Sequence, residues 1–218
     1  HIEKSKPYIN LNEVTIDNMT QKNLRLVIVT GGAHALLLNT EALPDEFIPK
    51  VLFGGNLGHG LNGKIDGQLG RVKSMKFAGQ NFKDIIGTFP DSTAFGTINN
   101  SEEFVRQGSI GGEILRRFIV TINYSQKLIV LKPILKLIHK PFDSDMSGLD
   151  IRAIGDKFDE FKIVDVIPNT PADIAGLITG DRIVFFNKKL ARNVTINDIY
   201  KALCEKEGDQ IDMIILRG

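Results

Sequence analysis

Few side chains in this sequence have the types and spacing that metal binding or cysteine chemistry needs. The 218 residues include one cysteine, Cys204, which excludes an internal disulfide and a cysteine-based zinc or iron–sulfur site. The four histidines are scattered and show no His-Glu-x-x-His spacing, so no metal is expected. Cys204 has no assignable catalytic partner and is expected to be a structural thiol. These residues also imply no cofactor.

The glycines from Gly58 to Gly63 have the spacing found in nucleotide-binding loops. Their spacing is that of a dinucleotide-binding string, and Gly63-Lys64 gives the segment the look of a phosphate-binding loop. Both loops need a helix that begins at the last glycine, because its N-terminal amides hold the phosphate. Here glycines recur every few residues, and Ile65 stands where a phosphate loop has Ser or Thr. The segment 54–70 is therefore expected to be a glycine-rich β-hairpin.

Two other motifs, about eighty residues apart, combine glycine turns with apolar strands. In the first, the apolar run Leu26–Val29 enters a tight Thr-Gly-Gly turn at residues 30–32 and leaves through a second apolar run. In the second, an Ile-Gly-Gly turn at residues 110–112 precedes a short helical pattern and an apolar strand. Together they resemble one half of a retropepsin- or pepsin-like aspartic peptidase over most of residues 6–133. In that family an Asp-Thr-Gly turn is crossed by an Ile-Gly loop.

The resemblance implies a reaction for which this half lacks the essential group. In the family each half contributes one aspartate, and the two carboxylates share a proton while one of them activates water. Here the carboxylate position is Val29, whereas Thr30 and Gly31 remain as the resemblance requires, and the crossing loop is Ile110 and Gly111. Valine has no proton to exchange. We therefore expect a degenerate site with no intact catalytic residue.

Three interpretations of Val29 stay open: a naturally inactive half, an engineered inactivating change, and a misplaced motif. The acids Asp17, Glu41 and Asp45 lie on other segments and do not replace the missing carboxylate. The chain opens without an initiator Met, and we expect it to be the C-terminal part of a longer protein. The resemblance implies that a second half, either upstream in that protein or in a homodimer mate, carries its own aspartate.

The glycine-rich hairpin has a place in the same resemblance. It falls where the family has the flap that closes over substrate. Its glycines suit a mobile tip, so Gly58, Gly60 and Gly63 are candidate flap residues.

Residues 139–218 carry a different set of motifs. The segments Ser147–Ile151, Asn169–Leu177 and Gly180–Ile183 resemble, in order, the Gly-Leu-Gly-Phe loop, the Ser-Pro-Ala…Ala-Gly-Leu helix and the Gly-Asp-x-Ile strand of a PDZ domain. A PDZ domain receives a terminal carboxylate on the amides of its loop and pairs an extended peptide with the following strand. The candidate peptide-binding residues on the loop and strand are Gly148, Leu149, Asp150 and Ile151.

A predicted helix contributes the other side of this candidate groove. Ile196, Ile199 and Leu203 fall on one helical face, and they either line the groove or belong to the core. Asp150 would repel a carboxylate. Binding of an internal segment, or a role within the molecule, therefore stays open beside binding of a protein C-terminus.

Periodicity and turn residues predict a mainly β chain with two units, residues 1–138 and 139–218. The resemblances imply that the first unit is a pepsin/retropepsin-like β-barrel lobe and that the second is a PDZ domain, a small β-barrel with two helices. Thr170 is expected to cap a short helix that Pro171 opens and Gly176 stops, and Thr195 with Asp198 to form a capping box. The other helices are expected at Gly112–Phe118 and Ile196–Lys206. The expected strands are Ile9–Ile16, Leu24–Val29, Leu36–Leu38, Gly63–Ile65, Arg71–Phe77, Ile85–Phe89, Ile119–Tyr124, Leu128–Leu131, Leu149–Ala153, Phe161–Val166, Arg182–Phe186 and Gln210–Leu216.

Charge and hydropathy exclude two classes of partner, nucleic acids and the interior of a membrane. The net charge is +1, so no nucleic-acid partner is expected. Residues up to position 142 include 17 basic and 12 acidic side chains and the rest 10 and 14, which indicates two units of opposite charge. No stretch approaches the roughly 18 uninterrupted apolar residues of a spanning helix, so no membrane span is expected. We expect an aspartic-peptidase-like segment, inactive as this chain, with a peptide-binding PDZ domain. The alternatives are a protease made active by its upstream half and a non-catalytic adaptor. The resemblance also implies an exported bacterial protein of the periplasm or cell envelope.

Overall fold

The computed structural model describes residues 2–3, 6–60, 63–91, 106–142, 145, 147–205 and 208–218. The chain divides into two compact units, residues 1–142 and 143–218. The first unit extends past the expected boundary at residue 138, because Ile138 and Phe142 are both buried in its core. Strands dominate both units, so the prediction of a mainly β chain is confirmed.

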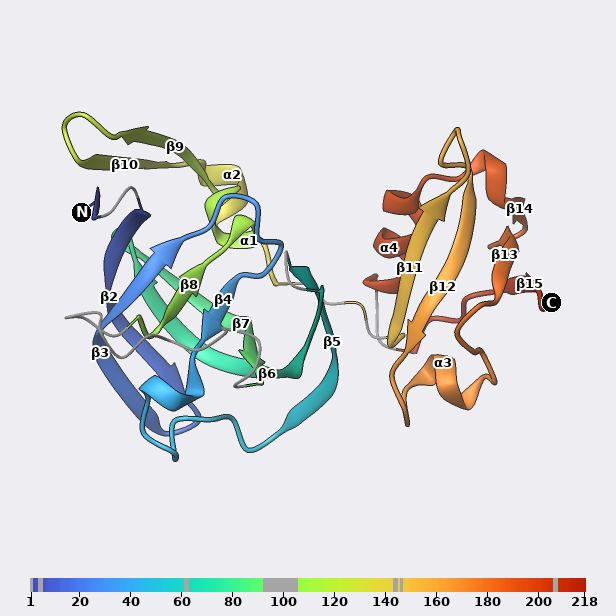
Figure 1. Cartoon of the computed structure of the whole chain (residues 1–218), viewed down its shortest axis with the longest axis horizontal. Coiled ribbons are helices and arrows are strands. Elements are labelled where there is room, and N and C mark those ends of the chain that lie inside the picture. Colours follow the sequence, from blue (N-terminus) through green and yellow to red (C-terminus); the bar gives the residue numbers. More distant parts are fainter. Residues whose placement is uncertain are drawn as a thin grey trace. The chain divides into compact units, whose positions relative to one another are not determined.

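In the first unit the described residues form one eight-stranded sheet, in the order β1-β2-β3-β8-β4-β7-β6-β5. Strand β8 lies between β3 and β4 (Figure 1), parallel to β3 and antiparallel to β4. The strands are β1 (Ile2–Glu3), β2 (Lys6–Ile16), β3 (Met19–Ile28), β4 (Leu36–Leu38), β5 (Leu52–Gly60), β6 (Gly63–Phe77), β7 (Gln80–Pro90) and β8 (Gly108–Ile110), with a 3₁₀ turn η1 (Thr40–Ala42) after β4.

Alternating apolar residues explain strand β3, where Leu24, Leu26 and Ile28 point to one face and are buried. Strand β6 corrects the sequence analysis, which expected two separate strands on either side of residues 66–70. The strand is continuous because its glycines are packing positions and not turns: a Cβ on Gly67 would lie 2.5 Å from the carbonyl oxygen of Phe89.

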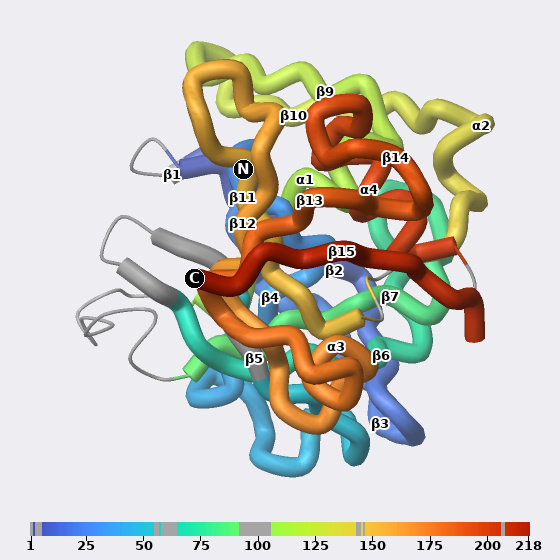
Figure 2. Tube along the Cα trace, turned by 90° about the vertical axis from the view of Figure 1, so that its right-hand side faces the viewer, coloured from blue at the N-terminus to red at the C-terminus, as the bar shows by residue number. Residues whose placement is uncertain are grey.

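A second, two-stranded sheet completes the first unit. Helix α1 (Gly112–Leu115) follows β8 and leads into β9 (Phe118–Asn123), which pairs with β10 (Leu128–Pro133) before helix α2 (Leu135–Ile138). In both views this hairpin stands beside the larger sheet (Figures 1 and 2). The predicted helix at 112–118 is thus confirmed but ends early, since β9 begins at Phe118.

A buried arginine holds the end of the first unit in place. Arg117 is only 1% exposed, and its guanidinium lies 3.8 Å from the ring centre of Phe142. It also donates to the Glu113 carboxylate at 3.0 Å. Further hydrogen bonds reach the backbone carbonyls of Leu137, Ile138, Lys140 and Pro141. One charged side chain therefore bonds four carbonyls at the end of α2 and in the segment that follows it.

The second unit is a small sheet with short helices. Strand β11 is at one edge, followed by β12, β13 and β14, while β15 pairs with β13 (Figure 2). Helix α4 contacts β11. The elements are β11 (Leu149–Ile154), β12 (Glu160–Val166), α3 (Pro171–Ile174), β13 (Arg182–Phe186), β14 (Lys189–Leu190), η3 (Ala191–Asn193), α4 (Ile196–Leu203) and β15 (Met213–Leu216).

The helix caps of this unit test two predictions. The capping box is confirmed, because Thr195 accepts from the Asp198 amide and Asp198 accepts from the Thr195 amide. The prediction for Thr170 is correct in its position before the helix but wrong in its side chain, which makes no capping hydrogen bond. The Thr170 hydroxyl donates to the Ile167 carbonyl at 2.6 Å, and Asp173 accepts from the neighbouring Asn169 amide instead.

Two element ends in the second unit also differ from expectation. Helix α4 ends at Leu203, and Lys206, where the predicted helix ended, lies outside the described residues. Strand β15 starts at Met213, three residues later than predicted. Within the part of the chain that the structure describes, no helix has the length and apolar character to cross a bilayer.

Candidate functional site

The turn that follows β3 is locked to the crossing segment by backbone hydrogen bonds. The Val29 amide donates to the Ile110 carbonyl at 2.9 Å, and the Gly111 amide donates to the Ala35 carbonyl at 3.1 Å. The turn itself closes between the Gly32 amide and the Val29 carbonyl at 3.2 Å. The structure thus brings the two glycine motifs, eighty residues apart in sequence, into direct contact.

Glycine at position 111 is what allows this approach. A Cβ there would lie 2.1 Å from the His34 carbonyl oxygen and 2.9 Å from that of Gly32, distances that real side chains do not reach. The requirement is for close backbone packing between the turn and the crossing segment. Val29 is half-buried at the base of the turn, whereas Thr30 and Gly31 are exposed.

Asp17, one of the acids considered in the sequence, does not reach this turn. Asp17 lies in the β2–β3 turn, at the far end of β3 from Val29, and its carboxylate accepts from the Lys50 amide at 3.0 Å. Glu113, which the sequence analysis did not single out, comes near through its backbone, since its amide donates to the His34 carbonyl. Its carboxylate is held by Arg116 and Arg117 instead. The Asp17 and Glu113 carboxylates are therefore both engaged away from the turn.

A histidine and a serine lie beside the turn, and both were missed from the sequence. His34 Nε2 is 2.9 Å from the hydroxyl oxygen of Ser109, which is 1% exposed. Burial, with a smaller contribution from the positive charge of Arg106, lowers the pKa of His34 to about 4. His34 is therefore neutral at pH 7. Ser109 is too buried to meet a substrate, so the pair satisfies a buried hydroxyl and is not a nucleophile with its base.

The glycine-rich segment is a β-hairpin, as predicted. Gly58 lies opposite Ile65, and Gly60 lies opposite Gly63 at the end of the β5–β6 ladder. Residues 61 and 62 of the nucleotide-loop string lie outside the described residues. Because a strand and not a helix begins at Gly63, the segment lacks the helix N-terminus that a bound phosphate would need.

In the second unit, the loop before β11 is tied to α3. Gly148 has φ +78°, a conformation that favours glycine. A Cβ at this position would also lie 2.2 Å from the Thr170 hydroxyl oxygen, so both the backbone conformation and the packing require glycine. The Gly148 carbonyl accepts from the Ile167 amide at 2.9 Å, and the Ser147 carbonyl accepts from Ala172 at 3.0 Å. The loop is therefore held rigidly at the start of the edge strand.

The candidate peptide-binding residues of this unit fall into two groups. Leu149 and Ile151 bury their side chains in the core, and Asp150 is half-buried between them on the same strand. On α4, Ile199 and Leu203 belong to the same core, and Ile196 packs against it. The α4 side chain that reaches the β11 backbone is one that the sequence analysis missed: the Tyr200 hydroxyl bonds both the amide and the carbonyl of Ile151.

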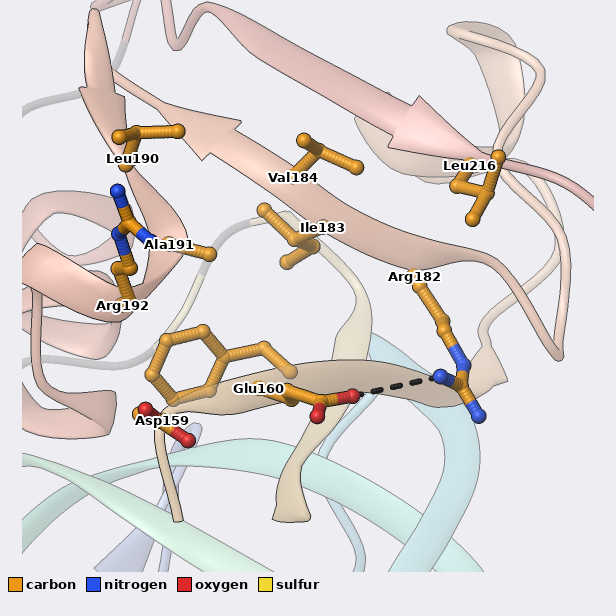
Figure 3. A pocket seen from close by; sticks show the side chains of 10 residues that line it. Asp159, Glu160, Arg182, Ile183, Val184, Leu190, Ala191, Arg192 and Leu216 are labelled. Carbon is orange, nitrogen blue, oxygen red and sulfur yellow. Dashed lines mark hydrogen bonds and ion pairs between the residues drawn. The ribbon is translucent and has the colours of Figure 1, made fainter. Parts of the chain in front are cut away.

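A hollow of about 350 Å³ opens on the second unit, and none of the candidate peptide-binding residues lines it (Figure 3). Arg182 and Glu160 form an ion pair of 3.3 Å at one end, and Asp159 and Arg192 lie at the other. The lining residues are Asp159, Glu160, Phe161, Arg182, Ile183, Val184, Leu190, Ala191, Arg192 and Leu216. Over the described ranges no cluster of three or more His, Cys, Asp or Glu side chains could hold a metal ion.

Comparison with known proteins gives structural neighbours only. No protein-family model and no curated protein sequence matches the chain. The EIAV protease in complex with the inhibitor HBY-793 is similar over 53% of this chain and 90% of its own, with 17% identity and a TM-score of 0.36. A retropepsin-like aspartic protease from Rickettsia conorii is similar over 60% of this chain and 85% of its own, with 16% identity and a TM-score of 0.39.

Proposed function

We propose that this chain recognises extended peptide segments without cleaving them. Its first unit is a retropepsin-like lobe whose catalytic position is Val29, and its second unit is a PDZ-like module with a groove between β11 and α4. The observation that carries the proposal is the bond from the Val29 amide to the Ile110 carbonyl. It sets an apolar side chain at the base of a glycine turn backed by the crossing segment, where the proposed chemistry needs a carboxylate.

Electrostatics supports recognition over hydrolysis in the first unit. A shared-proton mechanism needs two carboxylates close together, and a carbon side chain supplies no substitute. The neighbouring titratable group, His34, is neutral at pH 7 and bonded to a buried hydroxyl. The turn nevertheless keeps the exposed backbone of Thr30 and Gly31, which an extended segment can contact.

In the second unit, the edge of β11 that no described strand covers supports strand addition. Among the described strands β11 pairs with β12 alone, so its other edge faces α4. Ile151 directs both its amide and its carbonyl to that edge. Because the strand repeats every two residues, Ala153 presents its amide and carbonyl on the same side. An extended peptide can therefore add to β11 by backbone hydrogen bonds.

Hydrolysis is tested with a mixed peptide library at acid pH, with and without pepstatin, followed by mass spectrometry. The wild-type chain is expected to give no pepstatin-sensitive cleavage. Val29→Asp is expected to gain it, with a rate that rises as the square of protein concentration, because two copies must each bring one carboxylate. Val29→Asn has a similar size but no acidic proton, and serves as the matched control.

Each outcome of this test has a definite meaning. Pepstatin-sensitive cleavage by the wild-type chain would show that it is a peptidase and refute the proposal. Lack of turnover by Val29→Asp would remove the assignment of the catalytic turn to Val29–Gly31.

Peptide binding by the second unit is tested at the strand edge. Ala153→Pro removes one amide donor from the free edge and leaves the ladder with β12 intact, so affinity for library-selected peptides is expected to fall at least tenfold. Lys157→Ala, at an exposed position past the end of β11, is expected to bind as the wild type does. Equal binding by all three proteins would place the peptide elsewhere.

A further inference from the structure

We infer that Tyr200 is the gate of the β11–α4 groove, and that the groove accepts an internal extended segment and rejects a free C-terminal carboxylate. This inference rests on the proposed peptide binding. It goes further by stating which bonds a ligand must break and which ligand chemistry the groove selects.

The hydroxyl of Tyr200 occupies the backbone positions that a peptide would use. It accepts from the Ile151 amide at 3.0 Å and donates to the Ile151 carbonyl at 3.2 Å. These are the two hydrogen bonds that one residue of an added antiparallel strand would make with Ile151. A ligand strand and the Tyr200 hydroxyl therefore compete for the same pair of atoms.

A backbone amide next to the loop before β11 also has a side-chain partner within the chain. Ser147 donates its hydroxyl proton to the Asp145 carboxylate at 2.6 Å, which leaves its oxygen free to accept from the Leu149 amide at 3.1 Å. Asp145 also accepts from the Ser147 amide at 2.7 Å. Two of the amides that a terminal carboxylate would be expected to reach, those of Leu149 and Ile151, already have partners within the chain.

Charge at this end of the groove opposes a terminal carboxylate. Burial is the main cause of the raised pKa of Tyr200, and the Asp150 and Asp145 carboxylates lie close enough to its hydroxyl to raise the pKa further, although the hydrogen bond from the Ile151 amide and the charge of Arg152 act in the opposite direction. An incoming carboxylate would meet the same two charges in a partly desolvated site. A segment that continues past the groove, with a neutral amide in place of the carboxylate, avoids this repulsion.

Displacement of Tyr200 reduces the apparent affinity of any ligand. If binding requires the tyrosine to leave the strand edge, the apparent dissociation constant rises by the inverse of the fraction of molecules that are already open. Tyr200→Phe removes both hydrogen bonds and keeps the ring that packs against the core. It is expected to raise affinity about tenfold, the factor that corresponds to one net hydrogen bond.

The gate is first tested without ligand, by amide hydrogen exchange in the full chain. The Ile151 amide is expected to be protected in the wild type and to exchange at least tenfold faster in Tyr200→Phe. Lys201→Ala, the next residue on the same helix and exposed, is the matched control and is expected to leave exchange unchanged. Equal protection of Ile151 in wild type and Tyr200→Phe would overturn the inference.

The probe for binding is a decapeptide selected against Tyr200→Ala from a library acetylated at the N-terminus and amidated at the C-terminus. Its affinity is then measured for wild type, Tyr200→Phe and Lys201→Ala, and again with the same sequence as a free carboxylate. We expect Tyr200→Phe to bind about tenfold more tightly than the other two, and every protein to bind the amide form more tightly than the carboxylate form.

The possible failures separate the inference from the proposed function. Equal affinity of wild type and Tyr200→Phe would overturn the gate and leave peptide binding standing. Tighter binding of the carboxylate form would overturn the selection of internal segments. Failure of every variant, Tyr200→Ala included, to select any peptide would refute the proposed function itself, and the exchange of Ile151 would then decide whether Tyr200 closes the edge.

Discussion

Acidification is expected to destabilise the first unit through His34. This side chain lies beside the Val29 turn with Nε2 2.9 Å from the buried Ser109 hydroxyl. Burial is the main reason that its pKa falls from the usual 6.5 to about 4, and the charge of Arg106 adds to it. The perturbation is a change of pH from about 7.5 to 4, a range in which the unfolded chain takes up a proton that the folded unit resists.

The sign and size of the effect follow from these two pKa values. Because the folded pKa lies below the unfolded one, the contribution of His34 to stability is complete above pH 6.5 and is lost as the pH falls toward 4. One pKa unit corresponds to about 1.4 kcal/mol, so the free energy of unfolding is expected to drop by about 2 kcal/mol at pH 5 and by roughly 3 kcal/mol at pH 4.

The measurement is urea unfolding of the full chain at several pH values, followed through NMR signals of first-unit amides. His34→Gln is expected to lose this part of the pH dependence. His139→Gln, at an exposed position of the same unit, is expected to retain it. In parallel, the ring proton signal of His34 should titrate near pH 4. The reasoning is refuted if wild type and His34→Gln lose the same stability between about pH 7.5 and 5, or if His34 titrates near 6.5.

Two further predictions concern charged groups that hold chain ends. Arg117→Met is expected to destabilise the first unit by about 2–4 kcal/mol, because it removes a buried guanidinium that bonds the half-buried Glu113 carboxylate and four partly or fully buried carbonyls. Chemical unfolding measures this loss, with Arg116→Met as an exposed control, and equal losses in the two variants would contradict the prediction. Asp181 accepts two hydrogen bonds from Arg217 on the C-terminal segment, which lower the pKa of Asp181. The second unit is therefore expected to lose stability as the pH falls below about 3.8. Asp181→Asn is expected to remove that pH dependence and to lower the free energy of unfolding by about 1–3 kcal/mol at neutral pH. A pH profile of stability that is the same in wild type and Asp181→Asn would count against the pairing.

Local chemistry explains what the sequence could predict. Alternating apolar residues such as Leu24, Leu26 and Ile28 identify a strand because burial on one face repeats every two residues. The capping box at Thr195 is encoded within four residues. These features depend on neighbours in sequence, and the structure agrees with them.

The contacts that the sequence could not predict join residues far apart in the chain. His34 meets Ser109, 75 positions away, and Tyr200 meets Ile151, 49 positions away. A tyrosine on an amphipathic helix is compatible with a core, groove or surface position, and periodicity does not distinguish a ring in the core from a hydroxyl on a strand edge. The unbroken β6 was missed for a related reason, since glycine in sequence reads as a turn unless the packing partner is known.

At the proposed peptide site of the second unit, backbone amides already have partners within the chain. In the second unit, Ser147 and Tyr200 already bond the Leu149 and Ile151 amides, so a ligand exchanges hydrogen bonds and gains little from them. Net affinity must then come from burial of apolar side chains, at roughly 1.5–3 kcal/mol for each large aliphatic or aromatic residue. The ligand of this groove is thus expected to be an apolar internal segment, with specificity set by side chains and not by a terminus.

In the first unit, the ionisation of His34 makes stability depend on pH. A pair of carboxylates that share one proton works under acidic conditions, where one of them is protonated. Those are the conditions in which the pKa of His34, at about 4, costs the folded unit roughly 3 kcal/mol of stability. That is a large share of the 5–15 kcal/mol typical of a folded domain. A lobe with valine at position 29 and a half-buried neutral histidine beside it is therefore expected to be most stable near neutral pH, and acid cleavage by Val29→Asp would be carried out by a less stable unit.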